Sequence, residues 1–162
     1  MYLLAEDIEQ IGHVLAQRYF SEQGWEFTNL NLSSRKITGA VEVVNEQYSR
    51  YPYMSRDWYV ENSADKSFHL SDRWDELIAL ASLLQSCPDM FDFLLKINNQ
   101  ISLCIIKNLQ SDLTEQQQNA IADARKSGFN VYIFKAAVQQ SADFELEEVI
   151  GGISGTGTFN SL

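Results

Sequence analysis

The chain has 162 residues, of which 45% are hydrophobic and 21% are charged. This length fits one domain, and this composition is typical of a folded globular protein, which excludes a largely disordered chain. Its 22 acidic and 12 basic residues give a net charge of −10, and that sign opposes attraction of the whole surface to nucleic-acid phosphates.

The sequence also lacks the marks of a membrane or secreted protein. No apolar run approaches the roughly 20 residues that a helix needs to cross a bilayer. The amino terminus MYLLAEDIEQ carries acids where a signal peptide carries bases. Cys87 and Cys104 have no metal-ligand spacing and lie in or beside apolar segments, so we expect buried thiols. We therefore expect a cytoplasmic protein with no membrane partner.

The first third of the chain predicts a helix and then a β-hairpin. Residues 5–23 have apolar side chains at helical spacing, acids in the first turn, and Gly24 after the end. WEFTNLNL (25–32) and KITGAVEVV (36–44) are typical of strands and flank the polar segment SSRK. In the second of these strands, one face carries Ile37, Val41 and Val43.

The middle of the chain predicts an irregular insert followed by a helix. Residues 45–70 have no clear period, and we expect irregular structure with a short strand near DWYVE. SDRWDELIALASLLQSCP (71–88) has an apolar helical face, Ser71 or Asp72 as the N-cap, and Pro88 as the stop.

The last third predicts two central strands, a crossover helix and a further strand. FLLKI (93–97) and ISLCIIK (101–107) are continuous apolar runs that flank the turn-forming NNQ. LTEQQQNAIADARKSG (113–128) predicts a helix with a Thr114 and Gln117 capping box, Ile121 and Ala124 facing inward, and Gly128 as the terminator. NVYIFK (130–135) should then lie parallel to ISLCIIK. We expect a short helix over 143–149.

These elements predict one α/β domain over residues 1–150, with an insert at about 45–70. The element order favours three layers, with a mixed central sheet flanked by helices. Residues 151–162 are rich in Gly, Ser and Thr, and we expect a flexible tail there.

The segment PDMFDFLLKINNQISLCIIKN (88–108), followed by LTEQQ and AIADARKSGFNVYIF, resembles the core of the PD-(D/E)xK nuclease superfamily. The likeness is strongest to its virus-type replication-repair nuclease and Holliday-junction-resolvase-like branches, and it covers roughly residues 88–135. In those families a Pro-Asp precedes a strand, a tight turn leads to a strand ending in Glu-x-Lys, and a helix with a Leu-x-x-x-Gln start precedes a last strand. The resemblance implies a restriction-endonuclease-like fold.

The resemblance also implies a catalytic site, from which one residue is missing. The strand-edge acid corresponds to Asp92, with Asp89 as the alternative; the motif lysine corresponds to Lys107, and the helix glutamine to Gln117. The motif glutamate corresponds to Ile105, which cannot bind a metal. Such sites hold Mg²⁺ with oxygen ligands to polarise a phosphate and activate water, and one carboxylate alone binds this ion weakly.

Two other acids could replace the missing ligand, although each has a structural explanation. Glu9 matches an extra glutamate that many members of the superfamily carry on the first helix, and Glu115 matches a migrated carboxylate. Both lie in the first turn of a predicted helix, where acids are favoured in any case. Gln117 is explained by the capping box, Asp92 by a strand entrance, and Lys107 by a solvated strand end.

The two histidines give no sign of a nucleophilic triad. His13 and His69 are far apart in the sequence and have no recognisable partner, so we expect ordinary surface or core residues.

The segment QYSRYPYMSRDWYVE (47–61) mixes aromatic residues with arginine. The residues that would contact a nucleic acid or a protein partner are Arg50, Tyr51, Arg56 and Trp58. Such a composition suits base stacking with phosphate contacts, but it suits a protein interface or the packing of an insert equally well. The net charge disfavours nucleic acid.

Two functions follow from these observations. In the first, a nuclease fold has lost its metal site and serves as a binding or regulatory module, with a protein partner or a second copy of itself and with no cofactor. In the second, the chain is an active Mg²⁺-dependent deoxyribonuclease with a relocated carboxylate. Ile105 and the acidic balance favour the first function.

Overall fold

The computed structural model describes residues 5–50, 73–138, 142–149 and 154–159. The chain divides into two compact units, one comprising Met1–Asn31 with Met90–Leu162 and the other comprising Leu32–Asp89. That the chain forms a single domain stays a prediction, and each unit is considered by itself. Within the described residues, no helix is long and apolar enough to span a membrane.

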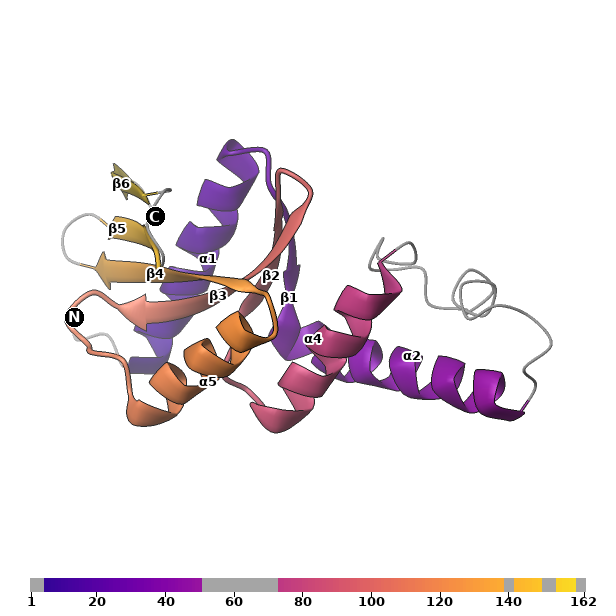
Figure 1. Cartoon of the computed structure of the whole chain (residues 1–162). Helices are drawn as coiled ribbons and strands as arrows, with labels where there is room; N and C mark the ends of the chain where they lie inside the picture. Colours follow the sequence, from indigo (N-terminus) through magenta and orange to yellow (C-terminus); the bar gives the residue numbers. More distant parts are fainter. Residues whose placement is uncertain (1–4, 51–72, 139–141, 150–153, 160–162) are drawn as a thin grey trace. The chain divides into compact units, whose positions relative to one another are not determined.

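The first unit is built on a mixed β-sheet (Figure 1). Its strands follow the order β1-β2-β3-β4-β5-β6, and only the β3–β4 pair among them is parallel. The strands are β1 (Glu26–Asn29), β2 (Phe93–Ile97), β3 (Gln100–Asn108), β4 (Asn130–Val138), β5 (Ala142–Glu148) and β6 (Ser154–Phe159). The expected α/β architecture with a mixed sheet is confirmed.

The β2–β3 hairpin forms where the sequence predicts a tight turn. Ile97 pairs with Gln100, so the connection consists of Asn98 and Asn99 alone. Both asparagines have positive φ angles, 50° and 64°. Two such residues in succession match the twist of the flanking strands, and asparagine tolerates this region better than most residues.

Helix α1 (Ala5–Glu22) covers one face of the sheet (Figure 1). Its buried residues Leu15, Ala16, Tyr19 and Phe20 form a core cluster with residues of β2, β3, β4 and β5. The helix also approaches the sheet closely, because a Cβ atom on Gly12 would lie only 2.9 Å from the Cγ2 atom of Ile106. The apolar spacing that predicts this helix therefore also identifies its buried face.

Helix α5 (Glu115–Lys126) covers the opposite face and connects β3 to β4 (Figure 1). Thr114 is its N-cap, and its side chain accepts a hydrogen bond from the Gln117 amide, while the Gln117 side chain accepts one from the Thr114 amide. The predicted capping box is confirmed, as is the burial of Ile121 and Ala124. Gly128, with φ of 90°, follows the helix, as expected for a terminator.

The expected hairpin between residues 25 and 44 is wrong in its second strand. Only β1 forms, and Leu30–Arg50 is a helix, α2. Its buried residues Ile37, Val41 and Val44 follow the helical spacing of three to four residues, whereas Val43 is 49% exposed. The β-branched composition suggests a strand, but the spacing of the buried side chains is helical. The irregular structure expected from residue 45 is also wrong as far as residue 50.

The expected carboxyl-terminal helix is wrong, and part of the expected tail forms a strand. Residues 143–148 of the helix expected over 143–149 lie instead in β5, where Leu146 is 1% exposed and its neighbour Glu147 is exposed. This alternation is that of a half-buried strand. In the segment expected to be a flexible tail, Ser154–Phe159 forms β6 and pairs antiparallel with β5.

The second unit contains α2 and helix α4 (Trp74–Ser86). The Gln85 side chain donates a hydrogen bond to the Glu42 carboxylate over 3.3 Å and so connects the two helices. The predicted cap of α4 is wrong, because the N-cap is Arg73, which makes no side-chain capping bond. Its guanidinium instead contacts Glu76 over 2.7 Å. Ser71, Asp72 and the segment DWYVE lie outside the described residues.

Candidate functional site

Asp92 lies directly before β2, at a point where β3 extends beyond its neighbour. The register pairs Phe93 with Cys104, so residues 105–108 of β3 have no partner strand on the β2 side. The Asp92 carboxylate accepts a hydrogen bond from the Ile106 amide over 2.8 Å, and the Asp92 amide donates to the Cys104 carbonyl over 2.8 Å. The Asp92 side chain therefore supplies a hydrogen-bond acceptor to β3 at a position that β2 does not reach.

The other oxygen of this carboxylate lies near a histidine from α1. His13 Nε2 is 3.4 Å from Asp92 Oδ1, and both side chains are about four-fifths buried, with exposures of 22% and 21%. The His13 ring also contacts Phe93, with 5.2 Å between ring centroids. The sequence identifies no partner for His13, and the structure provides one because α1 brings the histidine to Asp92, which lies 79 residues later in the chain. No spacing in the sequence could have indicated this pair. His69 lies outside the described residues.

Ile105, at the position of the motif glutamate, is a core residue. Its side chain is 1% exposed, and it lies in register with Ile133 of β4. Extension of the β2–β3 register by one residue would place it opposite Asp92. Ile105 shares the α5 face of the sheet with Ile133, whereas the Asp92 carboxylate contacts His13 of α1. The isoleucine therefore fills the layer between the sheet and α5 and offers no oxygen ligand to a metal.

Lys107 lies two residues further along β3, in register with Lys135 of β4. Both lysines line a pocket of about 600 Å³ on the α5 side of the sheet. Its other lining residues are Ser111, Asp112, Leu113, Gln118, Ile121, Ile133, Glu147 and Val149. The structure thus separates the sequence-predicted residues: the Asp92 carboxylate contacts α1 and the β3 backbone, whereas Lys107 faces this pocket.

The remaining candidates have diverse surroundings. Gln117 takes part in the capping box, and its neighbour Gln118 lines the pocket instead. Glu115 is exposed in the first turn of α5. Asp89 is exposed and has a φ angle of 60°. The side chain of Glu9 lies outside the described part of the chain. Among the described residues, no group of three His, Cys, Asp or Glu side chains is placed to hold a metal ion.

The aromatic and arginine-rich segment is described only at its start. Arg50 ends α2 and forms an exposed ion pair with Glu46, with 2.8 Å between nitrogen and oxygen. Tyr51, Arg56 and Trp58 lie outside the described residues, so their predicted role in binding stays a prediction.

Both cysteines are buried and free, as expected. Burial raises the pKa of the Cys104 thiol well above its ordinary value, and the negative charge of Asp92 raises it further. Because the thiolate is the reactive form of cysteine, a raised pKa makes this thiol inert. Cys104 is therefore a packing residue beneath Asp92.

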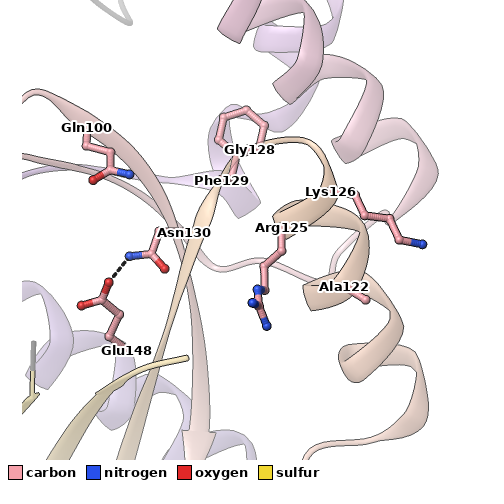
Figure 2. A pocket seen from close by; sticks show the side chains of 8 residues that line it. All are labelled: Gln100, Ala122, Arg125, Lys126, Gly128, Phe129, Asn130 and Glu148. Carbon is pink, nitrogen blue, oxygen red and sulfur yellow. Dashed lines mark hydrogen bonds between the residues drawn. The ribbon is translucent and has the colours of Figure 1, made fainter. Parts of the chain in front are cut away.

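A second pocket, of about 640 Å³, lies where α5 ends and β4 begins (Figure 2). Figure 2 shows the Asn130 side chain donating a hydrogen bond to the Glu148 carboxylate of β5, and Arg125 of α5 extending into the space beside them. Burial raises the pKa of the nearby Tyr132 hydroxyl to about 12, and the charge of Glu148 contributes. No sequence motif indicated this pocket, since its residues come from β3, α5, β4 and β5.

No protein-family model, no curated protein and no solved structure matches the chain.

Proposed function

We propose that this protein is a restriction-endonuclease-like domain that has lost its metal-dependent phosphodiesterase site and acts as a binding or regulatory module. The element order of the first unit supports the fold. A helix, three antiparallel strands, a helix on the other face and a strand parallel to the third follow one another as α1, β1, β2, β3, α5 and β4. The part from β2 to β4 follows the order that the PD-(D/E)xK resemblance implies for residues 88–135. Helix α1 and β1 precede it, and Leu32–Asp89 is inserted between β1 and β2.

The observation that carries the loss of activity is the burial of Ile105, together with the contacts that already occupy the Asp92 carboxylate. A hard divalent cation needs several oxygen ligands, and two carboxylates on neighbouring strands are the usual protein contribution. Ile105 offers none, and the Asp92 carboxylate accepts a hydrogen bond from the Ile106 amide and lies 3.4 Å from His13. These contacts give Asp92 a role in holding the β2–β3 junction without any metal.

The binding role is supported by what the same region retains. Lys107 keeps its place at the end of β3, in a pocket large enough for a small molecule. This region therefore has a cation and a cavity, although Ile105, at the position of the second metal ligand, is apolar. A net charge of −10 disfavours a broad nucleic-acid surface, so a local ligand site or a protein partner fits the chain better.

The test is a nuclease assay on the full chain. Purified protein is incubated with Mg²⁺ or Mn²⁺ and with plasmid, single-stranded and branched DNA, and compared with Asp92→Asn and Lys107→Gln. We expect the three proteins to show the same background cleavage. Cleavage by the unaltered chain that either substitution abolishes would overturn the proposal and establish an active nuclease with a relocated carboxylate. Asp92→Asn is preferred to Asp92→Ala because it retains an oxygen that can accept the Ile106 hydrogen bond.

A further inference from the structure

The pocket that contains Lys107 lies where ligands commonly bind in α/β proteins. β3 and β4 are parallel, and the pocket is formed beyond their carboxyl-terminal halves by the loop that leads into α5 and by the first turns of that helix. In open sheets, the carboxyl ends of parallel strands frequently border a ligand crevice. A volume of about 600 Å³ lies within the range of small-molecule sites.

The charge of the pocket is asymmetric. Lys107 and Lys135 are register partners on neighbouring strands, so two ammonium-bearing side chains start from the same level of the same face. Lys135 has a counter-ion, since its Nζ lies 3.6 Å from the Glu147 carboxylate. Within the described residues Lys107 forms no ion pair, although it is only partly exposed. Asp112 lines the rim but is exposed, where solvent and salt weaken its field.

The rest of the lining is apolar with a few hydrogen-bonding groups. Ile121 and Ile133 lie at the back of the wall and are only 7% and 5% exposed, whereas Leu113 and Val149 are partly exposed. The Gln118 amide and the Ser111 hydroxyl can donate hydrogen bonds. A ligand with an apolar body would remove the exposed parts of Leu113 and Val149 from water. Cationic and neutral donors together suit an acceptor group that carries negative charge.

We infer that this pocket binds a small organic anion, with a phosphate or carboxylate group on Lys107 and an apolar body against Leu113 and Val149. The inference rests on the proposed function in one respect, because it names the class of ligand that the proposed binding module would take. Binding needs no metal, since Lys107 itself provides the positive charge. Lys135 contributes less than Lys107, because Glu147 already neutralises it.

The experiment is an NMR titration of the full-length ¹⁵N-labelled protein with phenyl phosphate and, separately, with benzoate. Inorganic phosphate and benzyl alcohol serve as probes that carry only the anion or only the apolar body. We expect saturable shifts at the amides of Lys107, Gln118 and Ile133 with at least one of the two organic anions, and weaker binding of both partial probes. Lys107→Gln should weaken binding about tenfold or more, as expected for loss of a charge-assisted hydrogen bond.

Lys126→Gln is the matched control, since Lys126 is an exposed lysine of α5 that lines the other pocket and its loss changes the net charge equally. It should leave the affinity unchanged. Equal weakening by both substitutions, shifts that map elsewhere, or no saturation by either organic anion up to about 10 mM would overturn the inference. Equal affinity for inorganic phosphate would also overturn it. None of these results would indicate nuclease activity, and metal-dependent cleavage would not change the expected result of the titration. The two proposals can therefore fail independently.

Discussion

Replacement of Asp92 by alanine should destabilise the protein by about 2 kcal/mol, because a hydrogen bond to a charged acceptor contributes about 1.5–3 kcal/mol. The substitution leaves the Ile106 amide without its acceptor at 2.8 Å and His13 without its neighbour at 3.4 Å. Asp92→Asn keeps an oxygen acceptor but loses the charge, so we expect about half that loss. Asp112→Ala is the control, since Asp112 is exposed, and it should change stability by less than about 0.5 kcal/mol.

Two measurements check this prediction. Urea unfolding, followed by circular dichroism, gives the free energy of unfolding for each variant. Hydrogen exchange then locates the effect: the Ile106 amide should exchange faster in Asp92→Ala, while the Ile133 amide in the middle of β4 should change only with global stability. The reasoning is refuted if Asp92→Ala unfolds at the same urea concentration as Asp112→Ala, or if Ile106 keeps its full protection.

Three further predictions concern packing and titration. Gly12→Ala should destabilise the protein by about 1–3 kcal/mol through overpacking, because the new Cβ atom would lie 2.9 Å from Ile106. Gly39→Ala in α2 has no atom within 4 Å of its new Cβ and should stabilise the protein by about 0.5–1 kcal/mol. Thermal unfolding of both variants checks this prediction, and equal effects would contradict it. Burial holds the Tyr132 pKa at about 12, above the ordinary 10.0, so the neutral hydroxyl stabilises the fold below pH 10 and that contribution is lost as the pH rises toward 12. Tyr132→Phe should therefore lose less stability over this interval than the unaltered chain, and parallel losses in urea unfolding at both pH values would show that Tyr132 plays no part. Cys87 and Cys104 are buried, so neither should react with a thiol reagent until urea unfolds the protein, and rapid reaction of Cys104 in buffer would contradict its placement beneath Asp92.

The sequence predicts those parts of the fold that local chemistry determines. Two asparagines fix the β2–β3 turn, and Thr114 with Gln117 fixes the start of α5, because these side chains act on backbone groups within three residues. The parallel β4 follows from the crossover through α5. Helix α2 was missed because its β-branched residues favour strands locally, whereas the burial of Ile37, Val41 and Val44 favours a helix. β6 was missed because a Gly, Ser and Thr-rich segment forms a strand only when another strand, here β5, offers its edge.

The candidate site shows the same division. Ile105 and Lys107 were identified from a motif, and their positions on β3 follow from a predictable strand. The contact of His13 with Asp92, and the register of Lys107 with Lys135, depend on how distant elements pack, which no local pattern encodes. The sequence therefore predicts the strand that carries Ile105 and Lys107, but it does not predict which side chains lie next to the candidate residues.

The pairing of Asn29 with Phe93 has a consequence for how the two units depend on each other. The chain leaves the sheet and returns to it at adjacent positions, so β1 and β2 form a hairpin whose connection contains residues 30–92. Closing a flexible connection costs about 0.6 kcal/mol more for each doubling of its length, and this one is roughly four doublings longer than a four-residue turn. Even a fully unfolded Leu32–Asp89 would thus penalise closure of the hairpin by only about 2.4 kcal/mol relative to a tight turn. The insertion point can accept segments of very different length, and the long connection adds little entropic cost to the folding of the sheet.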